Sequence, residues 1–190
     1  MKLLSALLRI ICGVNSIVGK SVSWLSLGIV VTCFTVVVLR YLFSISFIWM
    51  QDLYVWLNGA MFTGVAAYAL FRDDHVRVDI FYGEASKKKK AIADMIGVVV
   101  FLLPFMWVVL AYSMTFVSRS WKYMEASANV GGMPGLFVLK SFIILFAVLV
   151  ALQGVAMLIR SLFVLVGRED LLPANYSYEA AEKHTPEEAV

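Results

Sequence analysis

The segment 141–159, SFIILFAVLVALQGVAMLI, decides the fold, because it places nineteen residues in a row without a charged side chain. A bilayer core of about 30 Å needs about 20 helical residues at about 1.5 Å each. Three more windows of this kind are 21–39, 53–71 and 95–118, and none of the four contains Asp, Glu, Lys, Arg or His. The windows show no alternation of polar and apolar residues, so they predict four transmembrane helices and not barrel strands.

The composition supports lipid as the solvent of this chain. Hydrophobic residues make up 62% of the 190 positions and charged residues 15%, whereas a soluble domain typically has about 45–50% and about 25%. A soluble domain of about 150 residues buries only about 70% of the surface of its unfolded chain. A soluble fold would therefore leave much apolar surface in water, and the sequence predicts an all-α integral membrane protein.

The distribution of Lys and Arg predicts the orientation of the helices. The N-terminal segment, the 72–94 loop and the C-terminal segment carry three, six and three of them, twelve in all, and the two other loops carry four. The positive-inside rule places the richer side in the cytoplasm. Four spans also return the chain to the side on which it starts, so we expect both ends to be cytoplasmic.

The chain is expected to have three parts. Residues 1–20 form an amphipathic helix, residues 21–166 hold the transmembrane helices at about 21–39, 53–71, 95–118 and 136–160, and residues 167–190 form a flexible cytoplasmic tail. The helix at 1–20 carries basic and small polar residues on one stripe and aliphatic residues opposite it, with Asn15 as the exception. This pattern is typical of a helix lying in the membrane interface; alternatively, the helix covers the side of a partner protein.

Ionisable groups for chemistry are missing from the predicted spans. Ion-coupled transporters usually hold such a group near the midplane, so a self-sufficient transporter is disfavoured. His75 and His184 lie outside the windows, and Cys12 and Cys33 form no CxxC pair. We therefore expect no enzymatic activity, no metal, no cofactor and no nucleic-acid partner. Pro104 removes a hydrogen bond from the third helix and predicts a kink there.

The loops contain three charged features. Arg40 and Asp52 flank the turn 41–51, where a salt bridge would join the first two helices, although an exposed pair contributes little. The charges of 72–79 indicate either a solvated turn or an interaction surface. The run of Lys87, Lys88, Lys89 and Lys90 is expected to fix the topology and to touch anionic headgroups, at about 1 kcal/mol per residue.

Two of these regions resemble a known family. The stretch RYLF at 40–43 with Ser46, Trp49 and Asp52, followed by HVRVD at 75–79, is similar to the small membrane subunit (DctQ-like) of the tripartite ATP-independent periplasmic, or TRAP, transporters. The resemblance covers residues 24–160. It implies a non-catalytic subunit of the bacterial inner membrane that scaffolds a large elevator subunit. The whole complex would use sodium to import an organic acid delivered by a periplasmic binding protein.

The resemblance also implies roles for particular residues. Those expected in subunit contact and helix anchoring are Arg40, Trp49, Asp52, His75, Arg77 and Asp79. The family often has Glu where this chain has Asp52, which keeps the charge but shortens its reach. The long outer loop 119–135 is a candidate docking surface for the binding protein, through Trp121, Lys122, Asn129 and Pro134. The alternative function is a structural or assembly subunit of another bacterial inner-membrane complex.

Overall fold

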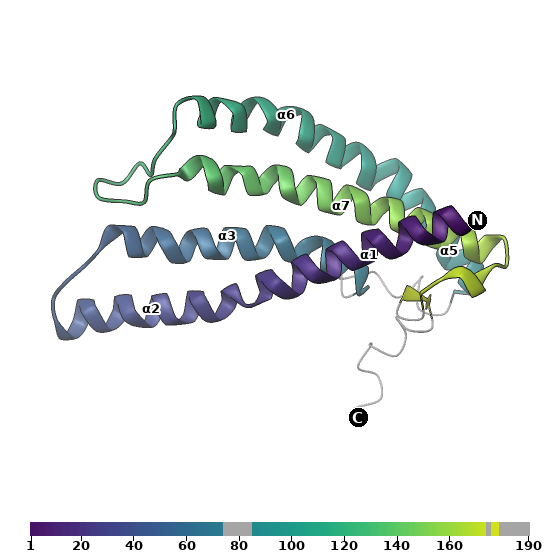
Figure 1. The fold of residues 1–190 in the computed structure, drawn as a ribbon, viewed down its shortest axis with the longest axis horizontal. Coiled ribbons are helices and arrows are strands. Elements are labelled where there is room, and N and C mark those ends of the chain that lie inside the picture. Colours follow the sequence, from purple (N-terminus) through teal and green to yellow (C-terminus); the bar gives the residue numbers. More distant parts are fainter. Residues whose placement is uncertain (74–84, 174–175, 179–190) are drawn as a thin grey trace. The chain divides into compact units, whose positions relative to one another are not determined.

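The regular elements are all helical in the computed structural model, which describes residues 1–73, 85–173 and 176–178 (Figure 1). In chain order they are α1 (Lys2–Ser23), α2 (Leu25–Leu42), α3 (Ile48–Phe71), α5 (Lys87–Gly97), the π-helix η1 (Val98–Leu102), α6 (Leu103–Lys122), α7 (Leu136–Leu165) and the 3-10 helix η2 (Glu169–Leu171). The expected all-α class is confirmed.

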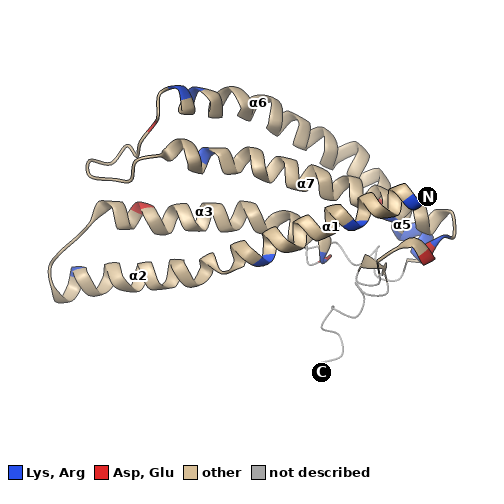
Figure 2. Ribbon diagram, in the orientation of Figure 1, with Lys and Arg blue, Asp and Glu red and all other residues tan. Residues whose placement is uncertain are grey.

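Four helical runs in the described residues are long and apolar enough to cross a membrane. They are Lys2–Leu42, Ile48–Phe71, Lys87–Lys122 and Leu136–Leu165. These runs are longer than the predicted helices, because a charge-free window measures the apolar length and helices continue past charged residues. Asp52 lies inside α3 and Arg160 inside α7. In Figure 2 the charged residues of α2, α3, α6 and α7 lie toward the ends of each helix.

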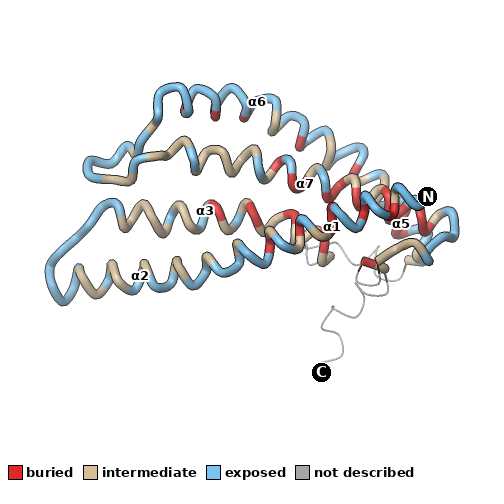
Figure 3. Tube along the Cα trace, viewed as in Figure 1, coloured by how far each residue is buried: buried red, intermediate tan, exposed pale blue. Residues whose placement is uncertain are grey.

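The chain divides into two compact units, which are described separately. Unit 1 consists of Met1–Ile17, Ala67–Met106 and Leu149–Val190, and unit 2 of Val18–Ala66 and Trp107–Val148. The buried core of unit 1 draws side chains from α1, α3, η1, α7 and the C-terminal segment (Figure 3). Its members are Leu8, Ile11, Cys12, Phe71, Val98, Ala156, Met157, Ile159, Phe163 and Tyr176.

Helix α1 is attached to unit 1 through a mixed face. Leu8 and Ile11, expected on a lipid-facing side, are buried together with the polar Ser5 and Asn15. The exposed apolar side chains follow a spacing of four and three residues and are Leu3, Leu7, Ile10, Val14 and Ile17. Helix α1 therefore covers part of its own chain, and it presents a second apolar stripe outward.

Unit 2 packs its helices through glycines. A Cβ added to Gly64 would lie 3.0 Å from both methyl groups of Val22, and one added to Gly59 would lie 3.2 Å from Leu139. Small residues at such crossings let helix backbones approach closely, as is common for helices in lipid. Every residue of α2 stays at least partly exposed (Figure 3).

The structure accommodates Pro104 with a change of helix type. The π-helix η1 lies just before Pro104 and ends with a hydrogen bond from the Leu103 N–H to the Val98 carbonyl. A wider turn at this point absorbs the bond that proline cannot make. The same turn packs closely on α7, since a Cβ added to Gly154 would lie 2.7 Å from Leu102.

Candidate functional site

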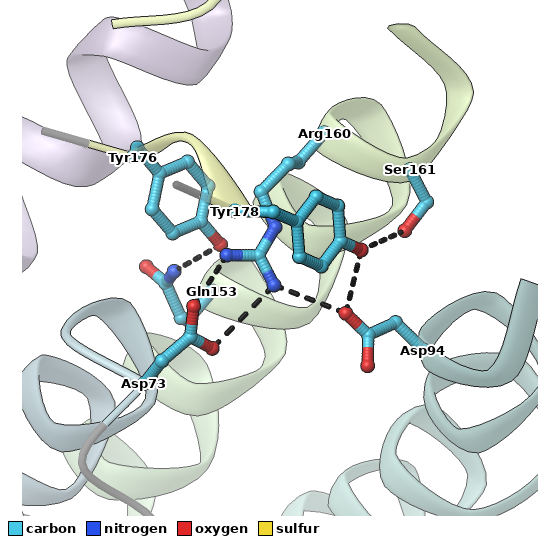
Figure 4. A network of polar contacts seen from close by, with 7 residues as sticks. All are labelled: Asp73, Asp94, Gln153, Arg160, Ser161, Tyr176 and Tyr178. Carbon is cyan, nitrogen blue, oxygen red and sulfur yellow. Dashed lines mark hydrogen bonds and ion pairs between the residues drawn. The ribbon is translucent and has the colours of Figure 1, made fainter. Parts of the chain in front are cut away.

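A buried arginine organises the polar interior of unit 1. Arg160, in the last two turns of α7, has a side chain with 0% exposure. Its Nη1 donates to Asp73 at 2.6 Å, and its Nη2 donates to Asp94 at 3.0 Å (Figure 4). Taking a charge out of water costs several kcal/mol unless a well-placed partner compensates. The two carboxylates supply that compensation from the end of α3 and from α5.

Two tyrosines of the C-terminal segment flank the guanidinium. Its central carbon lies 4.7 Å from the ring centre of Tyr176 and 4.3 Å from that of Tyr178, within the range of cation–π attraction. The Tyr178 hydroxyl donates to Asp94 at 2.7 Å. Burial raises the pKa of Tyr178 to about 12 and also raises the pKa of Tyr176. Both phenols are therefore neutral near pH 7.

The network continues to α1. Gln153 donates to the Tyr176 hydroxyl at 2.8 Å, and Asn15 donates to the Gln153 carbonyl oxygen at 2.8 Å. Asn15 and Gln153 are buried, where an amide needs hydrogen-bond partners. This explains why Asn15 interrupts the aliphatic face of α1: it joins α1 to α7 through the interior of the protein.

Local backbone features bring the parts of this cluster together. Asp73 follows the end of α3 with a φ of +58°, a left-handed conformation that Asp tolerates better than most residues. Gly167 ends α7 with a φ of +73°, and the next N–H, from Arg168, bonds to the Phe163 carbonyl. A glycine in this position reverses the chain after a helix. The chain then folds back over the other helices of unit 1.

The described part of the C-terminal segment packs against unit 1, whereas its composition predicts a flexible tail. Tyr176 and Tyr178 are buried, and the Ser5 hydroxyl donates to the Leu171 carbonyl at 2.8 Å. The acidic, proline-containing composition suggested disorder, but the two aromatic rings find an apolar and cationic surface to cover. Residues 179–190 lie outside the described residues.

In the sequence, Arg160 contributes only to the count of positive charges that predicts the topology. The available signal was its relation to Asp73 and Asp94, since each of the three flanks a charge-free window on the same predicted side. Opposite charges at neighbouring helix ends are candidates for pairing. The sequence pattern alone does not distinguish these two carboxylates from the other acidic residues on that side.

In unit 2, Asp52 organises the loop between α6 and α7. Its carboxylate accepts hydrogen bonds from the Asn129 side chain at 3.0 Å and from the Met133 N–H at 2.9 Å. A Cβ added to Gly132 would collide with this carboxylate. Two residues predicted for different roles, Asp52 and Asn129, therefore meet.

The expected salt bridge between Arg40 and Asp52 is not among the ion pairs of the described residues. Instead, loop donors bond to the Asp52 carboxylate, and Arg40 is exposed near the end of α2. The connection between α2 and α3 is also shorter than the predicted turn, since α2 ends at Leu42 and α3 begins at Ile48.

The other predicted loop residues are mostly exposed. Trp49 packs near Phe47, and Lys122 lies near the Tyr123 ring. Trp121, in the last turn of α6, donates to the Ser141 hydroxyl at 2.8 Å, which joins the end of α6 to α7. Pro134 is exposed just before α7. The predicted positions His75, Arg77 and Asp79 lie outside the described residues.

The lysine run does not act as a uniform headgroup surface. Lys88 and Lys89 are exposed, but Lys90 is buried in unit 1. Lys87 lies 3.6 Å from Glu169. Headgroup contact by this run stays a prediction, while the first turn of α5 packs Lys90 against its own chain.

A comparison with known protein families identifies the family of this chain. A family model described as "Tripartite ATP-independent periplasmic transporters, DctQ component" matches residues 29–164, well over half of the sequence. The chain belongs to the DctQ family. It is a non-catalytic membrane component of a TRAP transporter, as the resemblance predicted, and its family implies DctM and DctP as the other components. No curated protein and no solved structure matches it.

The matched segment divides the arginine cluster of this DctQ component. It includes Asp73, Asp94, Gln153 and Arg160, and it excludes Asn15, Tyr176 and Tyr178. The carboxylates and the arginine thus belong to the part of the chain shared with the family model. The two tyrosines come from the segment beyond it.

Proposed function

We propose that this DctQ component is a scaffold for a large elevator component that performs sodium-coupled uptake of an organic acid delivered by a periplasmic binding protein. The observation that carries the proposal is the absence of Asp, Glu, Lys, Arg and His from the windows 21–39, 53–71, 95–118 and 141–159. A transport site for a charged solute and an ion normally needs polar or charged groups near the midplane.

Several of the charges that flank the windows have partners within this chain. Arg160 binds Asp73 and Asp94, Asp52 binds the loop between α6 and α7, and Lys140 pairs with Glu125. Charges used in this way stabilise the subunit and are not available to bind a solute. These internal pairs favour a structural role for the chain over a role in binding the transported solute.

Reconstitution tests the scaffold function directly. Vesicles containing this chain alone should show no concentrative uptake under a sodium gradient. Vesicles that also contain DctM as the large component, with DctP added outside as the binding protein, should take up the substrate. Concentrative uptake by this chain alone would overturn the proposal, and so would full uptake by DctM and DctP without it.

We also propose the bacterial inner membrane, with both ends in the cytoplasm, as the setting of this subunit. The count of twelve against four Lys and Arg supports this orientation. In the same setting α1 lies at the membrane interface, with its exposed stripe in the acyl chains and Lys2, Arg9 and Lys20 near the headgroups. Reporter tags at the C-terminus and after Val130 should report opposite sides, and equal signals would contradict the topology.

The outer loop is the proposed docking surface for the binding protein. Val130 is 92% exposed at its tip, while Asp52 fixes the backbone beneath it at Met133. Replacing Val130 with Asp should weaken binding of DctP and leave co-purification of DctM intact. Deletion of residues 124–132 should have a larger effect, and unchanged DctP affinity in both variants would remove the loop from the site.

Arg40 and Trp49 are proposed to contact the large component, because both are exposed near the connection of α2 and α3. Arg40→Glu and Trp49→Ala should weaken co-purification with DctM. Lys89→Glu is a matched control, since Lys89 is also exposed but lies in unit 1. Equal co-purification of all three variants with DctM would remove Arg40 and Trp49 from the interface.

A further inference from the structure

The described part of the C-terminal segment, residues 169–173 and 176–178, contacts four different helices of unit 1. The Leu171 carbonyl accepts a hydrogen bond from Ser5 of α1, and Glu169 lies 3.6 Å from Lys87 of α5. The ring of Tyr176 stacks on Phe71 of α3 at 5.3 Å between centres. Contacts from the two tyrosines to α7 complete the set. One short segment thus joins helices that lie far apart in the sequence.

The same segment completes the burial of Arg160. The two rings lie on the guanidinium, and the Tyr178 hydroxyl occupies one oxygen of Asp94 that also binds Arg160 (Figure 4). Removing the segment would leave the guanidinium and Asp94 without these contacts. The ion pairs with Asp73 and Asp94 would remain, but they would face solvent or lipid.

The attachment of the segment is of a kind that can open locally. It follows a glycine turn at Gly167, and it is held by two rings and a few polar contacts rather than by a long packed helix. Segments with few buried contacts are the ones that open without global unfolding. The helices of unit 1 do not depend on the segment for their own backbone hydrogen bonds.

We propose that residues 169–173 and 176–178 act as a clasp, whose closure over Arg160 orders unit 1 and makes the subunit competent to assemble with the large TRAP component. The assembly part rests on the proposed scaffold function. When the clasp is open, the face of α1 that carries Leu8, Cys12 and Asn15 loses the ring that seals the core beside it.

Cys12 provides a direct probe of the clasp. It is buried in the same core cluster as Tyr176, and the chain has one other cysteine, Cys33, which Cys33→Ser removes. In that background, a chain ending at Pro173 lacks both tyrosines, and a chain ending at Tyr178 keeps them. These two truncations differ by five residues, so they isolate the clasp from the rest of the tail.

The expected result is a difference in the rate at which maleimide labels Cys12 in mild detergent. The chain ending at Pro173 should label at least about tenfold faster than full length, because losing two ring contacts on a cation makes local opening more frequent. The chain ending at Tyr178 should label like full length. Equal rates for the two truncations would overturn the clasp.

Full-length variants keep the test valid if the shorter chain folds poorly. Tyr178→Phe retains the ring over Arg160 and removes the hydrogen bond to Asp94, whereas Tyr178→Ala removes both. We expect Cys12 labelling to increase in the order wild type, Tyr178→Phe, Tyr178→Ala. No increase in Tyr178→Ala would contradict the proposal.

Co-purification with the large component tests the assembly part. The chain ending at Pro173 should recover at least about tenfold less of that component than the chain ending at Tyr178, if ordering of unit 1 precedes assembly. Faster labelling with equal recovery would overturn the assembly role. If even the full-length chain recovers none, the scaffold function fails, while the labelling rates still decide whether the clasp exists.

Discussion

Units 1 and 2 solve the problem of polar groups in an apolar chain in different ways. Unit 1 buries a full charge, Arg160, and surrounds it with two carboxylates, two phenols and the amide of Gln153. Unit 2 keeps its polar network in the loop around Asp52 and leaves every residue of α2 at least partly exposed. Unit 1 therefore meets most of its buried polar groups with its own side chains, although Asn15 Oδ1 and Arg160 Nε lack a hydrogen-bond partner among the described residues.

The difference shows where this subunit needs other molecules. The apolar side chains of α2 and α6 are exposed in large number, among them Phe34, Trp107 and Tyr112. Exposed apolar surface on this scale marks contact with lipid or with another protein. Unit 2 depends on such contacts. Unit 1 also exposes apolar side chains, such as Leu3 and Phe101, but its stability should depend in addition on its internal charge balance.

The largest expected effect comes from removing the buried charge. Arg160→Gln removes the guanidinium that bonds to Asp73 and Asp94 and should lower the free energy of unfolding by about 3–5 kcal/mol. Denaturant titration of the purified subunit measures this. The matched control is Arg168→Gln, because Arg168 pairs with Asp170 on the surface of the same unit.

The control should be indistinguishable from wild type. Adding Asp73→Asn and Asp94→Asn to Arg160→Gln should recover part of the loss, since no unpaired charge then remains. If Arg160→Gln were as mild as Arg168→Gln, the distinction between the two units would fail.

The next effect compares helix crossings. A methyl group at Gly154 of unit 1 would lie 2.7 Å from Leu102, and one at Gly64 of unit 2 would lie 3.0 Å from Val22. Gly154→Ala should cost about 1–3 kcal/mol by overpacking, and Gly64→Ala should cost less. Gly13→Ala meets no atom within 4 Å and should stabilise α1 by about 0.5–1 kcal/mol. Melting temperatures should follow this order, and a stabilised Gly154→Ala would contradict the close crossing.

The helices could be predicted from the sequence because lipid imposes a simple rule. A span needs a certain apolar length and must satisfy its backbone internally, so charge-free windows located all four spans. Helix ends were less predictable. Asp52 and Arg160 lie within helices, because a charged side chain near a helix end can find a partner without ending the helix.

The arginine cluster could not be predicted in the same way. Its members come from positions 15, 73, 94, 153, 160, 176 and 178, and their meeting depends on tertiary packing rather than on spacing along one helix. Tyr176 and Tyr178 lie in a stretch whose composition suggested disorder. The pairing of Asp52 with Asn129 and Met133 was hidden for a similar reason, since loop conformation determines which donors reach a carboxylate.

A smaller effect is expected in the loop of unit 2. Asp52→Asn replaces an acceptor-only carboxylate with an amide and weakens the bond from the Met133 N–H. Gly132→Ala should disturb the same place from the backbone side, because its Cβ would collide with Asp52. Both variants should speed hydrogen exchange at Met133 and leave exchange in unit 1 unchanged. Protection of the Met133 amide that survives both variants would show that Asp52 does not hold the loop.

The smallest expected effect is a difference in how the two units respond to pH. In unit 2, the hydrogen bond from Lys140, together with that from Ser120, lowers the pKa of Glu125. The stabilisation from this ionised carboxylate is therefore present above the ordinary pKa of Glu, about 4.3, and is lost as the pH falls through the lower folded value. In unit 1, burial raises the pKa of Tyr178 to about 12, so stabilisation by the neutral phenol is present below about pH 10 and is lost as the pH rises toward the folded value.

Melting temperatures measured across pH should show an acid limb that Glu125→Gln flattens and an alkaline limb that Tyr178→Phe flattens. If either substitution flattened both limbs, the two networks would not titrate independently, and the separation of the units would be contradicted.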